Sequence, residues 1–151
     1  MRGPLDDPDV VHVTADRASP ELSEAFGTLR RNAAVARDIE ARHGPIPGGR
    51  TAVLAMGKLG GREMAPDSDL DLILVYDHDP GVEASAGPRP LSVSQYYARL
   101  TQRLIAAVSA PTAEGVLYEV DMRLRPSGNQ GPVASHVETF RTYHRESAST
   151  W

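Results

Sequence analysis

The 151-residue sequence contains no cysteine, no long apolar run and no excess of basic residues. Without cysteine, disulfides and metal sites built on thiolates are excluded. No apolar stretch approaches the ~20 residues of a transmembrane helix, and the first residues lack the apolar core of a signal peptide. We therefore expect a cytoplasmic protein with no membrane partner. The formal net charge of −4 gives no sign of the positively charged surface that nucleic-acid binding usually needs, so we expect no nucleic-acid partner either.

What the sequence does contain is typical of one globular domain, with 40% hydrophobic and 24% charged residues. Residues 1–18 are polar and show no helical period, and we interpret them as a loose tail or a short strand. Residues 19–48 read as a leading helix and its linker: Ser19 can cap the helix, Pro20 fits its first position, and "HGPIPGGR" ends it. Residues 49–151 form the main domain.

Hydrophobic patterning predicts the elements of this main domain. Short apolar runs predict strands at 51–56 and 69–76, and alternation of apolar and charged residues predicts a third strand at 115–126. A helix is expected at 94–109. After the turn "SGNQGP", the segment "SHVE" at 135–138 has the pattern of a capping box that opens a last helix.

Carboxylates cluster where the second strand begins, in the segment "DSDLDL" that contains Asp67, Asp69 and Asp71. Because side chains alternate along a strand, Asp69 and Asp71 share one face, about 7 Å apart. Two like charges at this spacing favour a cation between them, and Mg²⁺ prefers carboxylate oxygens. A strand end whose charges are simply solvated is the alternative.

The third predicted strand, "YEVDMRLRP", adds a further carboxylate. One face would carry its charged residues, Glu119, Asp121, Arg123 and Arg125, and the other its apolar residues, Tyr118, Val120, Met122 and Leu124. If this strand lies beside 69–76, Asp121 can join the first two carboxylates. Three carboxylates can hold two divalent ions, the arrangement that promotes in-line displacement at phosphorus. The arginines could grip phosphate, or they could form a solvated face paired with Glu119.

Three better-known motifs do not match. A calcium-binding EF-hand loop needs glycine and glutamate where this chain has Leu72 and His78. A P-loop needs serine or threonine where Leu59 follows Gly-Lys, and "GKLGGR" lacks the dinucleotide fingerprint. What remains is Gly60 and Gly61 after one strand and Asp-x-Asp on the next; glycines let the backbone approach a polyphosphate closely.

This order of motifs resembles the nucleotidyltransferase superfamily. "GKLGGREMAPDSDLDLILVYD" and "LYEVDMRLRPSGNQGP" are similar to the glutamine synthetase adenylyltransferase family, and the resemblance covers residues 42–151. It implies an α+β fold in which a small mixed sheet carries the site and helices pack on one face. It also implies Mg²⁺-dependent transfer of AMP from ATP to a tyrosine hydroxyl of glutamine synthetase. A second half of the family enzyme removes AMP by phosphorolysis, and Glu119 and Ser127 favour the adenylylating half.

The resemblance also assigns roles to individual residues. It implies that Asp69 and Asp71 bind two Mg²⁺ ions, that Asp121 completes the acceptor-side metal, and that Gly60 and Gly61 cradle the triphosphate. Further phosphate contacts are expected from Lys58, Ser68, Arg123 and Arg125. Expected partners are glutamine synthetase and, in the full-length family, a nitrogen-signalling regulatory protein.

Departures from the family leave two other functions open. Family proteins are several times longer, and this catalytic core is expected to be truncated at its C-terminus, where Ser147 and Ser149 replace usual family residues. The chain could therefore be a catalytically silent remnant that binds nucleotide or glutamine synthetase. It could also adenylylate a small molecule.

Overall fold

The computed structural model describes residues 35–61, 63–65, 68–111, 113, 115 and 119–146. The predicted tail at 1–18 and the start of the leading helix lie outside these residues. Residues 35–43 are helical, which agrees with the end of the leading helix. That helix stops where Gly44, at φ 73°, adopts the left-handed conformation and donates its N–H to the Glu40 carbonyl oxygen.

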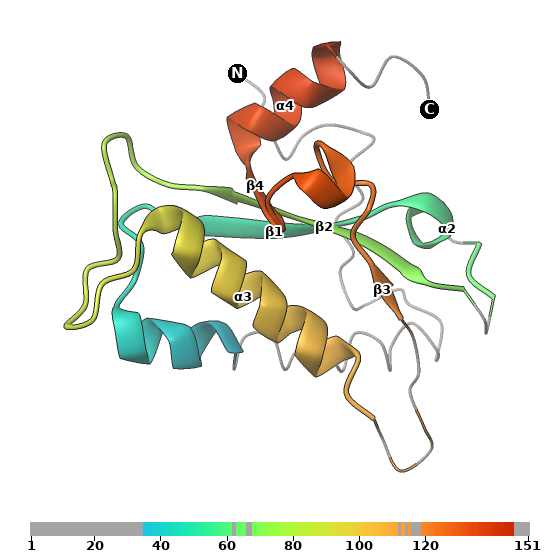
Figure 1. Cartoon of the computed structure of the whole chain (residues 1–151), viewed down its shortest axis with the longest axis horizontal. Coiled ribbons are helices and arrows are strands. Elements are labelled where there is room, and N and C mark those ends of the chain that lie inside the picture. The colour runs from blue at the N-terminus through green and yellow to red at the C-terminus, as the bar shows by residue number, and fades with distance from the viewer. Residues whose placement is uncertain are drawn as a thin grey trace.

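The strands form one small mixed sheet around β2 (Figure 1). β1 (Arg50–Ala55) pairs with β2 (Leu70–Asp77) in antiparallel fashion, while β3 (Val120–Asp121) and β4 (Ala134–His136) both pair with β2 in parallel. β3 lies beside the start of β2, and β4 lies beside its end. The predicted α+β class and mixed sheet are confirmed.

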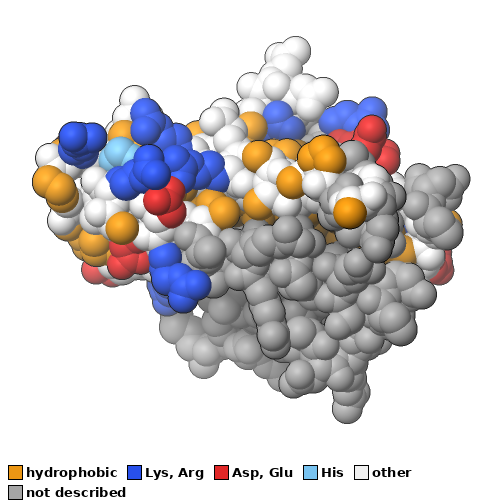
Figure 2. Space-filling model, turned by 90° about the horizontal axis from the view of Figure 1, so that it is seen from below, with side chains coloured by type: hydrophobic (Ala, Val, Ile, Leu, Met, Phe, Trp, Pro, Cys, Tyr) orange, Lys and Arg blue, Asp and Glu red, His pale blue; other side chains and the backbone are white. Residues whose placement is uncertain are grey.

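One face of the sheet is covered by α3 (Val93–Val108), which agrees within one residue at each end with the predicted helix 94–109. The buried residues Tyr97 and Leu100 of α3 pack in one core with Ile39 and Leu74. Asp38 ties the helical residues 35–43 to α3, because it bonds both Arg42 and Arg103. Figure 2 shows basic side chains gathered on this lower side of the molecule. None of the helices described is long and apolar enough to cross a membrane.

The opposite face of the sheet is contacted by α4 (Val137–Glu146), which stands above the sheet in Figure 1. There Ile73 and Val75 of β2 form a second core with Val137 and Phe140 of α4. Because β2 is apolar on both faces, both need covering. The sequence analysis expected helices on one face of the sheet. The structure has α3 on one face and, in addition, α4 on the other.

The prediction of a strand over 115–126 is wrong in its extent, because among the described residues of this range only those of β3 form a strand. After β3 the chain turns: Arg125 donates its N–H to the Met122 carbonyl oxygen, and a 3-10 helix follows at Gly128–Gln130. Met122 and Val120 pack in the α3-side core, as predicted. Leu124, expected with them, packs instead on the α4 side. An alternating pattern does not show at which residue a strand ends and a turn begins.

The predicted capping box at 135–138 is also wrong. Ser135 lies inside β4, opposite Val75, with only 1% of its surface exposed. The Glu138 N–H at the start of α4 instead donates to Nδ1 of His136, at 3.2 Å. Pairing with β2, which is distant in sequence, takes Ser135 into the sheet.

Candidate active site

The parallel pairing of β2 with β3 aligns two of the predicted carboxylates. Asp71 is the register partner of Asp121, and the Leu70 N–H donates to the Glu119 carbonyl oxygen at 2.8 Å. Side chains of paired residues in neighbouring strands point to the same face. Both carboxylates therefore stand on the α4 side of the sheet, since Val120 packs on the α3 side. The two segments do pair, which is the condition under which Asp121 can join the other carboxylates. Asp67 lies outside the described residues.

Electrostatics place Asp69 in the same neighbourhood. Burial raises the pKa of the Asp71 carboxyl, and the negative charges of Asp121 and Asp69 raise it further. The positive charges of Arg123 and Lys58 act on the same pKa in the opposite direction, and more weakly. Asp71 is thus a half-buried carboxylate with two like charges near it, an arrangement that costs energy unless a cation joins it.

Asp121 has a partner of its own. Its Oδ1 accepts the Arg123 backbone N–H at 2.8 Å, and its Oδ2 accepts from the Arg123 guanidinium, at 2.6 Å from Nε and 2.5 Å from Nη2. These contacts hold the pKa of the Asp121 carboxyl below its usual value. The side chain of Asp121 is 14% exposed and that of Arg123 is 70% exposed, so the arginine lies on the solvent side of the Asp121 carboxylate.

Gly57, at the start of the short helix α2 (Gly57–Gly60), contacts the Asp71 carboxylate directly. A Cβ atom at Gly57 would lie 2.4 Å from Asp71 Oδ2, and Gly57 has the left-handed φ of 53°. The neighbouring Met56 N–H donates to the Asp71 carbonyl oxygen at 2.9 Å. Sequence reasoning missed Gly57; its signal was that "GKLGG" begins with a further glycine.

The glycine pair predicted to cradle phosphate lies at the end of α2. The N–H groups of Gly60 and Gly61 donate within this turn, to the carbonyl oxygens of Met56 and Gly57, each at 2.9 Å. A Cβ at Gly60 would lie 2.6 Å from the Ala55 carbonyl oxygen. The structure therefore gives Gly60 a packing role, and phosphate binding by the pair stays a prediction.

Two of the predicted phosphate contacts are buried and already bonded. Ser68, 6% exposed, accepts the Ala65 N–H on its hydroxyl at 3.1 Å and so closes the turn before β2. Arg125, 8% exposed, donates from Nη1 to the Met122 carbonyl oxygen at 2.7 Å and lies 3.5 Å from the Gly131 carbonyl oxygen. Both residues hold the backbone around the carboxylates. Lys58 and Arg123, by contrast, are exposed.

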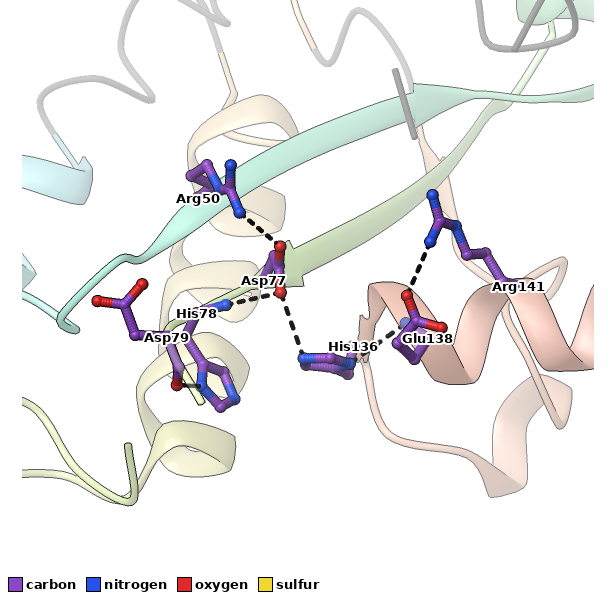
Figure 3. A network of polar contacts seen from close by, with 7 residues as sticks. All are labelled: Arg50, Asp77, His78, Asp79, His136, Glu138 and Arg141. Carbon is purple, nitrogen blue, oxygen red and sulfur yellow. Dashed lines mark hydrogen bonds and ion pairs between the residues drawn. The ribbon is translucent and has the colours of Figure 1, made fainter. Parts of the chain in front are cut away.

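At the far end of β2, the carboxylate of Asp77 is surrounded by hydrogen-bond donors and a cation (Figure 3). Asp77 accepts from Nη2 of Arg50 at 2.7 Å and from the His78 N–H at 2.9 Å, and its Oδ1 lies 3.6 Å from Nε2 of His136. At the other end, the like charges of Asp121 and Asp69 act on Asp71 more strongly than the positive charges of Arg123 and Lys58. This contrast makes the β2–β3 end the candidate site.

Oxygen ligands at the β2–β3 end suit Mg²⁺ in kind, since hard divalent ions bind carboxylates. The charges of Asp69 and Asp121 that raise the pKa of Asp71 are the ones that a cation would neutralise. Over the part of the chain that the structure describes, no three such side chains stand in metal-binding geometry. The donor set fits the ion, and the predicted two-ion site stays a prediction.

A small mixed sheet that carries aligned aspartates on neighbouring parallel strands beside a glycine turn defines an α+β, nucleotidyltransferase-like protein. The family model described as glutamate-ammonia ligase adenylyltransferase matches residues 22–151, and the chain belongs to this family. The family predicted from the sequence is therefore confirmed.

Relatives of this chain carry the name bifunctional glutamine synthetase adenylyltransferase/adenylyl-removing enzyme. The Brucella suis protein is 60% identical over 139 residues, covering 92% of this chain and 14% of the relative. The Agrobacterium fabrum protein is 63% identical over 137 residues, covering 91% of this chain and 14% of the relative. The chain thus spans about 14% of the length of the curated relatives that it matches.

Proposed function

We propose that this chain transfers AMP from ATP, with Mg²⁺, to a tyrosine hydroxyl of glutamine synthetase. The observation that carries the proposal is the alignment of Asp71 with Asp121 on parallel strands, with the charge of Asp69 acting on the same site. The names of the relatives support glutamine synthetase as the acceptor and ATP as the AMP donor.

Each residue has a defined part in the proposed reaction. Asp69 and Asp71 would hold the ions, and Asp121 would complete the set on the acceptor side. Bound Mg²⁺ would lower the pKa of the tyrosine hydroxyl and neutralise charge on the leaving group. Lys58 and Arg123, exposed cations that act on Asp71, would contact phosphate oxygens.

The chemistry is a single displacement at phosphorus. The tyrosine oxygen forms a bond to the α-phosphorus, while the bond from that phosphorus to the bridging oxygen of the β-phosphate breaks. Pyrophosphate leaves with the electron pair, and the phenolic proton passes to solvent. Gly57, which has no side chain, leaves room for the Asp71 carboxylate beside α2, and Ser68 and Arg125 hold the backbone of the segments that carry the aspartates.

The direction and the setting complete the proposal. Glu119 and Ser127 match the adenylylating rather than the adenylyl-removing half of the family. We place the reaction in the cytoplasm, with a nitrogen-signalling protein as the regulator of the longer enzyme. Of the two activities in the relatives' names, this chain would supply the attachment of AMP.

A labelled-nucleotide assay tests the proposal. The chain is incubated with ATP labelled at the α-phosphate, Mg²⁺ and unmodified glutamine synthetase, and the acceptor is omitted in a control. We expect label on glutamine synthetase that depends on the chain and on Mg²⁺. Absence of label from the acceptor, with the chain folded, would refute the proposed activity.

A second candidate function is a silent chain that only binds nucleotide or glutamine synthetase. Two observations favour it. The Asp121 carboxylate is already bound by the Arg123 guanidinium, and among the residues described no three acidic side chains are arranged to hold a metal ion. This function predicts binding of ATP or glutamine synthetase without transfer of label, so direct binding measurements beside the assay separate the two.

A further inference from the structure

An open groove lies between α4 and the turn that follows β3; we name it the α4 groove. On the turn side it is lined by Pro126 and Ser127. On the helix side it is lined by the outward residues of α4, Glu138, Thr139, Thr142, Tyr143 and Glu146. Most of the lining side chains carry hydroxyl or carboxylate groups, so this surface can form many hydrogen bonds.

The α4 groove lies on the same side of the sheet as the aspartates. α4 packs on the face of β2 that carries Ile73 and Val75, and Asp71 belongs to this face by alternation. Ser127 follows Asp121 by six positions, and in Figure 1 the turn that contains it lies between β3 and α4. A chain bound in the groove would therefore approach the carboxylates from the α4 side.

Charge divides this side of the molecule into two regions. The described residues that line the groove include two glutamates and no lysine or arginine. Glu138 is paired with Arg141 at 2.8 Å, and Glu146, the other carboxylate of the groove, forms no ion pair with the described residues. The cations that act on Asp71 are Lys58 and Arg123. The groove thus offers phosphate no cation among its described lining residues, whereas Lys58 and Arg123 lie beside the aspartates.

The turn that forms one wall of the groove is conformationally unusual. Ser127 has φ 61°, the only non-glycine residue with positive φ in the described part of the chain. Such a conformation costs a non-glycine residue energy and is found more often at functional sites. The Ser127 side chain is exposed, so its hydroxyl is available to a bound molecule.

We infer that the α4 groove binds the polypeptide segment of the acceptor protein that presents the tyrosine, and that it binds no part of the nucleotide. Hydroxyls both donate and accept hydrogen bonds, so Thr139, Thr142 and Tyr143 suit the amide groups of an extended peptide. The carboxylates favour a segment with neutral or basic side chains. This inference rests on the proposed function and adds where the acceptor docks.

The test places an arginine in the groove and compares it with the same change elsewhere. Thr142→Arg blocks the groove at an exposed position of α4, and arginine favours a helix more than threonine does, so the fold is retained. Gln102→Arg adds the same side chain at an exposed position of α3, on the other face of the sheet. Thr139→Arg serves as a second groove variant, and thermal melting verifies that each variant folds.

Two affinities are measured for each variant: that for immobilised glutamine synthetase without nucleotide, and that for ATP with Mg²⁺. We expect Thr142→Arg and Thr139→Arg to weaken glutamine synthetase binding at least tenfold and to leave ATP binding unchanged. Gln102→Arg should change neither. In the transfer assay, the groove variants should raise KM for glutamine synthetase and leave KM for ATP as it was.

The outcomes separate this inference from the proposed function. If the parent chain transfers AMP and the groove variants lose ATP affinity instead, or lose nothing, the inference is overturned while the function stands. If the parent chain binds glutamine synthetase through the groove yet transfers no AMP, the docking inference stands and the proposed activity fails. A parent chain that does not bind glutamine synthetase overturns the inference.

Discussion

Replacing Gly57 with alanine tests whether the position of the Asp71 carboxylate governs activity. The new Cβ would lie 2.4 Å from Asp71 Oδ2, whereas ordinary contact begins at 3.4 Å. To relieve the overlap, the carboxylate or α2 must move by about 1 Å, and a displacement of this size costs on the order of 100-fold in rate at a site that depends on geometry. We therefore expect Gly57→Ala to lower AMP transfer by about 100-fold.

The same substitution also has a backbone cost, which must be separated from the effect on the site. At φ 53°, a residue with a Cβ is destabilised by roughly 1–2 kcal/mol, equivalent to a fall of about 2–8 °C in Tm for a chain of this size. Gly81→Ala is the matched control, because Gly81 has φ 78° and nothing within 4 Å of its added Cβ. It should lose similar stability and keep its activity.

The assay is transfer of α-labelled AMP to glutamine synthetase, with Tm measured on the same samples. A Gly57→Ala chain that transfers AMP at the rate of Gly81→Ala would show that the contact between Gly57 and Asp71 does not matter. The exact position of the Asp71 carboxylate would then not limit the rate of transfer.

Three further predictions concern the metal, the central aspartate and a buried arginine. Millimolar Mg²⁺ or Mn²⁺ at fixed ionic strength should raise Tm, because an ion that binds the folded chain stabilises it; a Tm that ignores both ions counts against the site. Asp71→Asn should abolish transfer and raise metal-free Tm at pH 7. Burial and the charges of Asp121 and Asp69 raise the folded pKa of Asp71 above 3.8, so ionisation of this carboxyl destabilises the fold at higher pH. The gain in Tm from Asp71→Asn should therefore be present at pH 7 and vanish below pH 3.8, and melting both chains at pH 7 and at pH 3.5 tests this. Arg125→Met should cost about 1–3 kcal/mol, since the buried Met122 carbonyl loses its guanidinium partner; unchanged stability with a raised KM for ATP would instead support the predicted phosphate contact.

Local patterns in the sequence were sufficient for much of the fold and for the shared face of Asp71 and Asp121. The predicted strands 51–56 and 69–76 correspond to β1 and β2 with shifts of one residue, because each is a short apolar run with polar residues at its ends. α3 was predictable from its helical period. Alternation also assigned Asp71 and Leu74 to opposite faces correctly, since a strand has a fixed period of two.

What the sequence could not predict depends on contacts between distant residues. Ser135 has the spacing of a helix cap, but pairing with Val75 draws it into β4. Arg125 was expected to contact phosphate from its place after Asp121; that its guanidinium lies buried against the Met122 carbonyl depends on a turn that the alternating pattern does not show. Gly57 matters through the space it leaves for Asp71, and no local pattern reports that space.

The most direct test of the central claim is to compare labels from the two ends of ATP. Glutamine synthetase is incubated with the chain, Mg²⁺ and ATP labelled at either the α- or the γ-phosphate, and the labelled residue is identified by mass spectrometry. The account predicts α-label alone, attached to a tyrosine as AMP, and its loss with Asp69→Asn. Label from the γ-phosphate, or α-label that persists in Asp69→Asn, would contradict it.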